Sequence, residues 1–174
     1  MERRIHGQIY NVPGQLAATS DNGNAMLLFR SPKLVYDYRN DAIYKKILRD
    51  HFANVGWKVP VILKAMVDAE KLYFDEICQI KMSQWTKGRV ALIGDAAHCA
   101  GFPTGMGTSL AMRGATLLAD ELLKAAGAHE SAFANYNRIF HPVVEPIQDT
   151  IEQGLDFLVP ATSEAIDLRN KLIR

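Results

Sequence analysis

One glycine-rich segment has residue types and spacing suited to binding a polar ligand. The apolar run 89–93 is typical of a short strand covered on both faces, and it ends at Gly94 and Asp95. The carboxyl end of such a strand is where ligands bind in open α/β sheets, and a carboxylate there can accept hydrogen bonds from sugar or polyol hydroxyls. Gly105 and Gly107 then let the backbone approach a ligand at a helix start, where free N–H groups and the helix dipole favour negative charge.

The same segment resembles the second flavin-binding motif of the class A flavoprotein monooxygenases, the para-hydroxybenzoate hydroxylase and tetracycline-hydroxylase type. That motif is a strand, Gly-Asp-Ala-Ala-His, a proline, Gly-x-Gly and a long helix rich in small residues. The chain matches it from Gly88 to about Leu123 without a gap. The resemblance implies FAD as cofactor and NAD(P)H as reductant of the parent enzyme. The implied cofactor-binding residues are Gly94, Asp95, Pro103, Gly105, Met106, Gly107, Thr108 and Ser109.

The resemblance also implies a role for each part of the motif. Asp95 would bind the ribityl and pyrophosphate region of FAD. The backbone from Gly105 to Gly107 would face the pyrimidine end of the isoalloxazine ring, with the helix dipole stabilising negative charge on the reduced flavin. Met106, Ser109 and Gly114 stand where the family more often has Gln, Asn and Asp. Backbone donors survive all three changes.

Other interpretations of these residues remain open at this point. Asp95 could be a helix N-cap, and the helix that follows the two glycines could serve tight packing through Ala111, Gly114 and Ala115 rather than a flavin face. His98 is expected to stabilise the loop or lie beside the cofactor rather than act as a base. No catalytic side chain is assigned, and no metal site, because Asp95, His98 and Cys99 match no tetrahedral ligand spacing.

The Gly-x-Gly-x-x-Gly fingerprint that opens a dinucleotide-binding βαβ unit is not found. Only Gly105 and Gly107 have its first spacing, and position 110 is leucine. We therefore expect a mixed α+β and α/β fold: a fragment of the two-domain flavin monooxygenase fold that lacks the N-terminal βαβ unit. The run 89–93 would then be an exposed apolar edge, so self-association or pairing with an N-terminal flavin-domain segment is expected.

Turn residues and periodicity predict the elements around the motif. Strands are expected at 8–10, 16–19, 25–29 and 34–38, separated by Pro13-Gly14, Asp21–Asn24 and Ser31-Pro32. Helices are expected after Asp41 as cap, from Pro60, and over 108–126. Between them, an alternating strand is expected at Cys78–Met82 and a turn at Trp85–Gly88. The C-terminal helices are expected to be interrupted or started by Pro142 and Pro146. Residues 1–85 are assigned to the substrate-binding domain, 86–128 to the C-terminal part of the FAD-binding domain, and 129–174 to C-terminal helices.

Composition indicates an ordinary globular protein. The 174 residues are 48% hydrophobic and 22% charged, with a formal net charge of +1. This balance gives no reason to expect nucleic acid or an anionic membrane as partner, and no apolar stretch approaches the roughly 20 residues of a membrane span. Two cysteines make no disulfide framework, which favours a reducing cytoplasm.

These observations together predict the C-terminal portion of an FAD- and NAD(P)H-dependent monooxygenase, an oxidoreductase acting on a small aromatic or polycyclic organic substrate. The chain alone is expected to be inactive. The alternatives are a truncated non-catalytic fragment and a self-associating or split-enzyme module that does not bind FAD alone.

Overall fold

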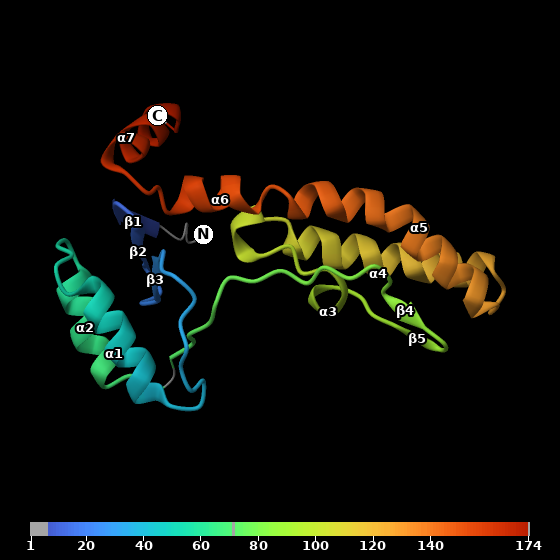
Figure 1. Ribbon diagram of the computed structural model, residues 1–174, viewed down its shortest axis with the longest axis horizontal. Helices are drawn as coiled ribbons and strands as arrows, with labels where there is room; N and C mark the ends of the chain where they lie inside the picture. Colours follow the sequence, from blue (N-terminus) through green and yellow to red (C-terminus); the bar gives the residue numbers. More distant parts are fainter. Residues whose placement is uncertain (1–6, 71, 174) are drawn as a thin grey trace, which may run out of the picture. The chain divides into compact units, whose positions relative to one another are not determined.

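The computed structural model describes residues 7–70 and 72–173 and divides the chain into two units. The first contains the described residues up to Asp75 and from Asp156 onward; the second is Glu76–Leu155. Each unit has its own buried cluster of apolar side chains. Helices and antiparallel strands together confirm a mixed α and β architecture (Figure 1).

A three-stranded antiparallel meander forms the sheet of the first unit. Its strands are β1 (Gly7–Val12), β2 (Gln15–Ser20) and β3 (Ala25–Phe29), paired in that order. The three corresponding strand predictions are confirmed, because turn residues separate the strands where expected. The predicted strand 34–38 is wrong: these residues form no ladder.

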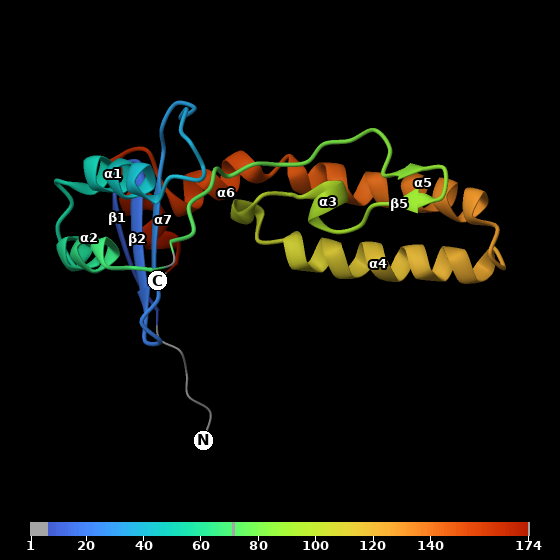
Figure 2. The ribbon, with the colours of Figure 1, turned by 90° about the horizontal axis from the view of Figure 1, so that it is seen from below.

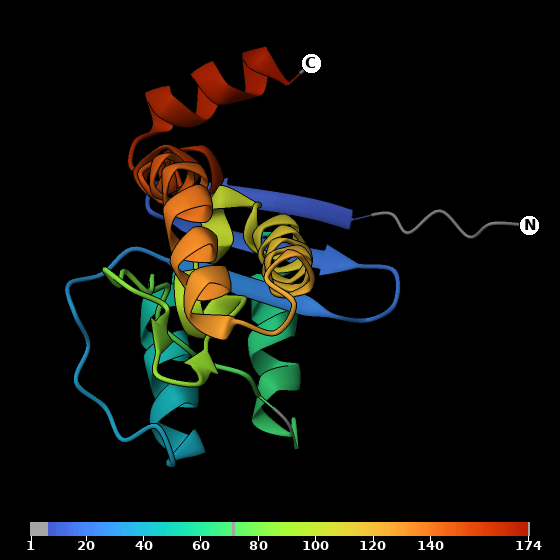
Figure 3. The ribbon, with the colours of Figure 1, turned by 90° about the vertical axis from the view of Figure 1, so that its right-hand side faces the viewer.

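Two helices cover one face of this sheet, α1 (Asp41–Phe52) and α2 (Val59–Val67) (Figure 3). Their apolar stripes meet the sheet in one cluster: Ala17, Leu48, Phe52, Val55, Val59 and Met66. The predicted cap of the first helix is off by one residue. Asn40 is the N-cap, and its side chain accepts a hydrogen bond from the N–H of Ala42 at 3.1 Å. The last helix, α7 (Ser163–Leu172), contacts β1.

The second unit is built on two long helices, α4 (Gly107–Lys124) and α5 (His129–Gln148). A short connection makes them antiparallel, and they lie side by side along their length (Figure 2). Before them come the hairpin strands β4 (Thr86–Lys87) and β5 (Val90–Ala91), the one-turn helix α3 (Asp95–His98) and the 3-10 turn η1 (Phe102–Thr104). Helix α6 (Ile151–Leu158) follows α5. The core cluster is Trp85, Ala97, Ala100, Leu110, Tyr136, Phe140 and Val144.

Pro142 and Pro146 lie inside α5, so the prediction that they interrupt or start helices is wrong. Each proline removes one N–H and frees the carbonyl four residues earlier. Both prolines are exposed, and their spacing of four places the freed carbonyls on the same solvent-facing side. Water can therefore bond those carbonyls, and packing of the opposite face holds the helix together.

The strands of the second unit are shorter than the sequence suggests. Only Val90 and Ala91 of the run 89–93 form a ladder, and the side chains of Val90 and Ile93 are 61% and 44% exposed. Cys78–Met82 is extended but pairs with no strand among the described residues. Within residues 7–70 and 72–173, no helix is long and apolar enough to cross a lipid bilayer.

Candidate functional site

The first part of the predicted site is the turn from β5 into α3. Gly94 has φ +60° and ψ −144°, a conformation that costs any residue with a side chain. A Cβ there would lie 3.5 Å from the Cβ of Ala111, so the start of α3 is set against the second turn of α4. Asp95 is the first residue of α3 and is exposed. Gly94 occupies the N-cap position, so the N-cap interpretation of Asp95 is wrong.

The second part is the turn that starts α4. Pro103 is buried in η1, and Gly105 ends the turn in the left-handed conformation, with φ +65°. The Met106 N–H donates to Oγ1 of Thr104 at 3.3 Å, and α4 begins at Gly107. No side chain caps this helix, so its first-turn N–H groups, those of Gly107, Thr108 and Ser109, are available to a ligand.

The space in front of this helix start is open. A Cβ at Gly105 or Gly107 would meet no atom of the described residues within 4 Å. Tight packing therefore does not explain these two glycines, whereas it does explain Gly114, where a Cβ would lie 2.9 Å from Phe140 and 3.0 Å from His98. An open helix start with unbonded N–H groups fits the electron-rich pyrimidine edge of a flavin, and an exposed carboxylate fits its ribityl hydroxyls.

His98 lies in the core and does not face solvent. It is 2% exposed, and its ring meets those of Trp85 and Phe140 edge-on, with centroids 5.1 and 5.2 Å away. Its Nε2 lies 3.5 Å from the hydroxyl of Tyr136, which donates to the carbonyl of Leu92 at 3.2 Å. His98 thus anchors α3 to α5.

Burial controls the protonation of this pair. It lowers the pKa of His98 below the ordinary 6.5, although the nearby Asp95 carboxylate acts in the opposite direction. It raises the pKa of Tyr136 to about 12, so the phenol keeps its proton. His98 is therefore neutral at pH 7, which suits a structural residue.

This lowered pKa makes the stability of the fold depend on pH. Below pH 6.5 the unfolded chain protonates His98 while the folded chain does not, so stability is full above that pH and falls as the pH is lowered toward the folded-state pKa. We expect the melting temperature to drop between pH 7 and 5, and to drop less for His98→Asn. Titration of the His98 imidazole by NMR gives the direct check, and a midpoint at or above 6.5 would contradict the prediction.

A separate hollow of about 910 Å³ lies between the β4–β5 hairpin and α5. Its lining includes Lys87, Arg89, Asn137, Arg138 and His141. None of the eight predicted cofactor-binding residues lines it. The candidate site is therefore the open helix start and the Gly94–Asp95 turn.

Comparison with known proteins relates most of the chain to flavoproteins. The family model described as FAD binding domain matches residues 37–150. A flavin-dependent monooxygenase from an unknown prokaryotic organism is 45% identical over 134 residues, covering 77% of this chain and 34% of that protein. A flavin-dependent monooxygenase of Legionella longbeachae is 41% identical over 137 residues, covering 76% of this chain and 35% of that protein.

Solved structures show the same relationship. The crystal structure of tetracycline destructase Tet(55) matches with a TM-score of 0.81 and 38% identity, over 96% of this chain and 46% of that one. Klebsiella pneumoniae HpxO, complexed with FAD and uric acid, shares the fold with a TM-score of 0.69 at 20% identity, over 94% and 43% of the two chains. The chain thus spans less than half the length of the proteins it matches.

Proposed function

The chain belongs to the FAD binding domain family of flavin-dependent monooxygenases, and on this premise we propose that it carries the flavin-facing part of an FAD site. The residues proposed to contact FAD are Gly94, Asp95, Pro103, Gly105, Met106, Gly107, Thr108 and Ser109. The observation that supports this assignment best is the uncapped start of α4, open in front of Gly105 and Gly107.

Each residue set has a distinct task in this proposal. The Asp95 carboxylate accepts hydrogen bonds from ribityl hydroxyls, and Gly94 gives the turn that presents it. The first-turn N–H groups of α4, aided by the helix dipole, donate to the pyrimidine edge and stabilise negative charge there. Pro103, buried within η1, holds the turn before α4 in place. Bound FAD would supply the redox and oxygen-transfer chemistry, with NAD(P)H as the proposed reductant.

The proposed substrate of the whole protein is a small aromatic or polycyclic organic molecule. Support comes from the similarity to tetracycline destructase Tet(55), whose name identifies a polycyclic substrate, at 38% identity. The proposed division of the chain assigns residues 1–85 to the substrate-binding domain, 86–128 to the flavin domain and 129–174 to C-terminal helices.

Removal of the Asp95 carboxylate is expected to weaken FAD binding. Hydrogen bonds to a charged group contribute about 1.5–3 kcal/mol, so Asp95→Ala should raise the dissociation constant about 10- to 100-fold. FAD titration followed by flavin fluorescence and the visible spectrum measures this. Asp120→Ala, which removes an exposed carboxylate from the far part of α4, is the matched control and should change nothing. Equal affinities for the two variants would overturn the role given to Asp95.

A second candidate function is favoured by the exposed apolar edge of β5. Among the described residues β5 pairs only with β4, so its other edge has no partner strand, and the side chains of Val90 and, just after the strand, Ile93 are 61% and 44% exposed. On this proposal the chain binds FAD only after self-association or with a flavin-domain segment from another polypeptide. FAD uptake that appears only at high chain concentration, or only after addition of the N-terminal half of a relative, would distinguish it from a non-catalytic fragment, which takes up none.

A further inference from the structure

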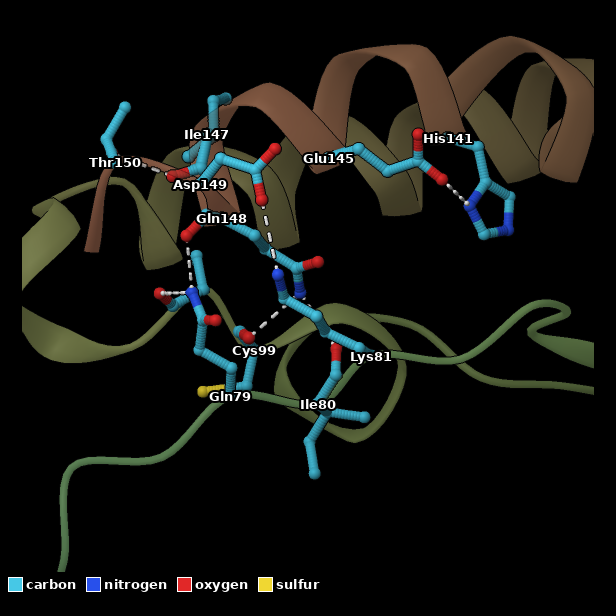
Figure 4. A network of polar contacts seen from close by, with 11 residues as sticks. Gln79, Ile80, Lys81, Cys99, His141, Glu145, Ile147, Gln148, Asp149 and Thr150 are labelled. Carbon is cyan, nitrogen blue, oxygen red and sulfur yellow. Dashed lines mark hydrogen bonds and ion pairs between the residues drawn. The ribbon is translucent and has the colours of Figure 1, made fainter. Parts of the chain in front are cut away.

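Two glutamine side chains from distant parts of the second unit hold the same stretch of backbone (Figure 4). Nε2 of Gln79 donates to the carbonyls of Ala100 at 2.9 Å and Gln148 at 2.7 Å. Nε2 of Gln148 donates to the carbonyls of Ile80 at 2.8 Å and Cys99 at 3.1 Å. Each amide nitrogen thus binds one carbonyl of the 99–100 backbone and one further carbonyl, that of Gln148 for Gln79 and that of Ile80 for Gln148.

The chemistry of this arrangement requires glutamine. Gln148 is 4% exposed at the last turn of α5, and both of its N–H groups are used. Glutamate has the same shape but no N–H to donate, and asparagine is one methylene shorter. Loss of the donor would leave the carbonyl of Ile80 facing a carboxylate and that of Cys99 with the N–H of Ile80 alone. Since buried carbonyls without a donor are costly, the pair is well suited to fixing this backbone.

The held backbone leads directly into the candidate cofactor turn. Next along the chain is Gly101, where a Cβ would lie 2.7 Å from Cδ1 of Ile151 and 3.3 Å from the carbonyl oxygen of Cys78, so the backbone here is closely packed. The Gly101 carbonyl accepts hydrogen bonds from the N–H and the hydroxyl of Thr104, at 3.2 and 2.9 Å. The Thr104 hydroxyl in turn accepts from the N–H of Met106, the N-cap of α4. The glutamines are thus linked to the helix start through the 99–101 backbone and the hydrogen bonds of Thr104.

We propose that Gln79 and Gln148 are positioning residues of the FAD site, which hold the 99–101 backbone and thereby set the turn Thr104–Gly107 against the flavin. The proposal rests on the proposed function, because it assigns the flavin to this helix start. Neither glutamine belongs to the eight residues proposed to contact FAD, and neither was singled out by sequence motif.

The test is Gln148→Glu in the full chain, read out by amide hydrogen exchange and by FAD titration. The amides of Thr104, Gly105 and Met106 report on the turn, because they donate to acceptors within residues 101–104. Their exchange should accelerate about tenfold or more, while amides in the middle of α4 and α5 stay unchanged. FAD should bind about tenfold more weakly, with a shifted visible spectrum. Gln79→Ala provides a second variant from the other side of the pair.

Lys81→Ala is the matched control. It removes an ion pair with Asp149 at 3.2 Å from the same two segments, but both partners are exposed, so exchange and FAD affinity should stay as in the parent chain. Unchanged exchange in a folded Gln148→Glu chain would overturn the proposal, and so would faster exchange with unchanged FAD affinity. If the parent chain binds no FAD, even at high concentration or with the N-terminal half of a relative added, the proposed function fails, and the exchange data alone decide whether the pair holds the turn.

Discussion

Replacing Trp85 with alanine is expected to cost about 3–5 kcal/mol of folding stability, the largest effect of any substitution considered. The indole is 2% exposed at the centre of the second unit's core. It stacks on the ring of His141, with centroids 3.9 Å apart, and lies 5.1 Å from His98 and 5.4 Å from Tyr136. Removal of the ring therefore leaves a cavity between α3 and α5, and His98 of α3 loses an aromatic neighbour.

Urea denaturation followed by far-ultraviolet circular dichroism measures this loss. Trp57→Ala is the matched control, because Trp57 is 37% exposed and stacks on a single ring, that of Tyr10, at 5.6 Å. Its substitution should cost less than half as much. Equal losses for the two tryptophans would show that Trp85 does not centre the core of the second unit.

Replacing Gly154 with alanine is expected to destabilise the chain by about 1–3 kcal/mol and to weaken FAD binding. A Cβ at this position would lie 2.2 Å from the carbonyl oxygen of Pro103 and 2.7 Å from its carbonyl carbon. These are backbone atoms, so α6 or the η1 turn must shift. The η1 turn directly precedes Gly105. A shift of this turn should therefore also lower the affinity for FAD.

Two physical effects predict opposite changes in folding stability for Gly154→Ala. Gly154 lies inside α6, where helix propensity alone predicts that alanine stabilises by roughly 1 kcal/mol. The close approach to Pro103 predicts the opposite. Gly56→Ala is the control, because a Cβ there meets nothing within 4 Å. Chemical denaturation decides between the two expectations, and a stabilised Gly154→Ala chain would refute the contact-based one.

Short-range signals in the sequence predicted much of the first unit. Pro13-Gly14 and Asp21–Asn24 marked the turns of the meander, and β3 begins and ends where its apolar run does. The start of α4 and its glycines followed from the Gly-Asp-Ala-Ala-His motif. Such signals are readable because turn chemistry and helix starts depend on the backbone conformation of a few adjacent residues.

Burial was harder to predict. Trp85 was placed in a turn and is the centre of a core, while Val90 and Ile93 were expected in a covered strand and are exposed. The alternation Cys78–Met82 predicted a strand, yet this segment is held by Gln148 and by one hydrogen bond from Ile80 to Cys99. Gln148 follows Val144 by four residues on the apolar face of its helix, and a polar residue at such a position could have indicated a buried hydrogen-bond partner.

The sequence by itself determined the family, the cofactor and the turn and helix elements of the motif, because these depend on residue types at fixed local spacing. Only the tertiary structure decided that His98 is a core residue and that Gln79 and Gln148 bond the 99–100 backbone. It also decided that Gly105 and Gly107 face open space while Gly114 and Gly154 are tightly packed. The physical reason is that burial and hydrogen-bond partnership depend on which distant segments meet, and one-dimensional spacing does not specify those meetings.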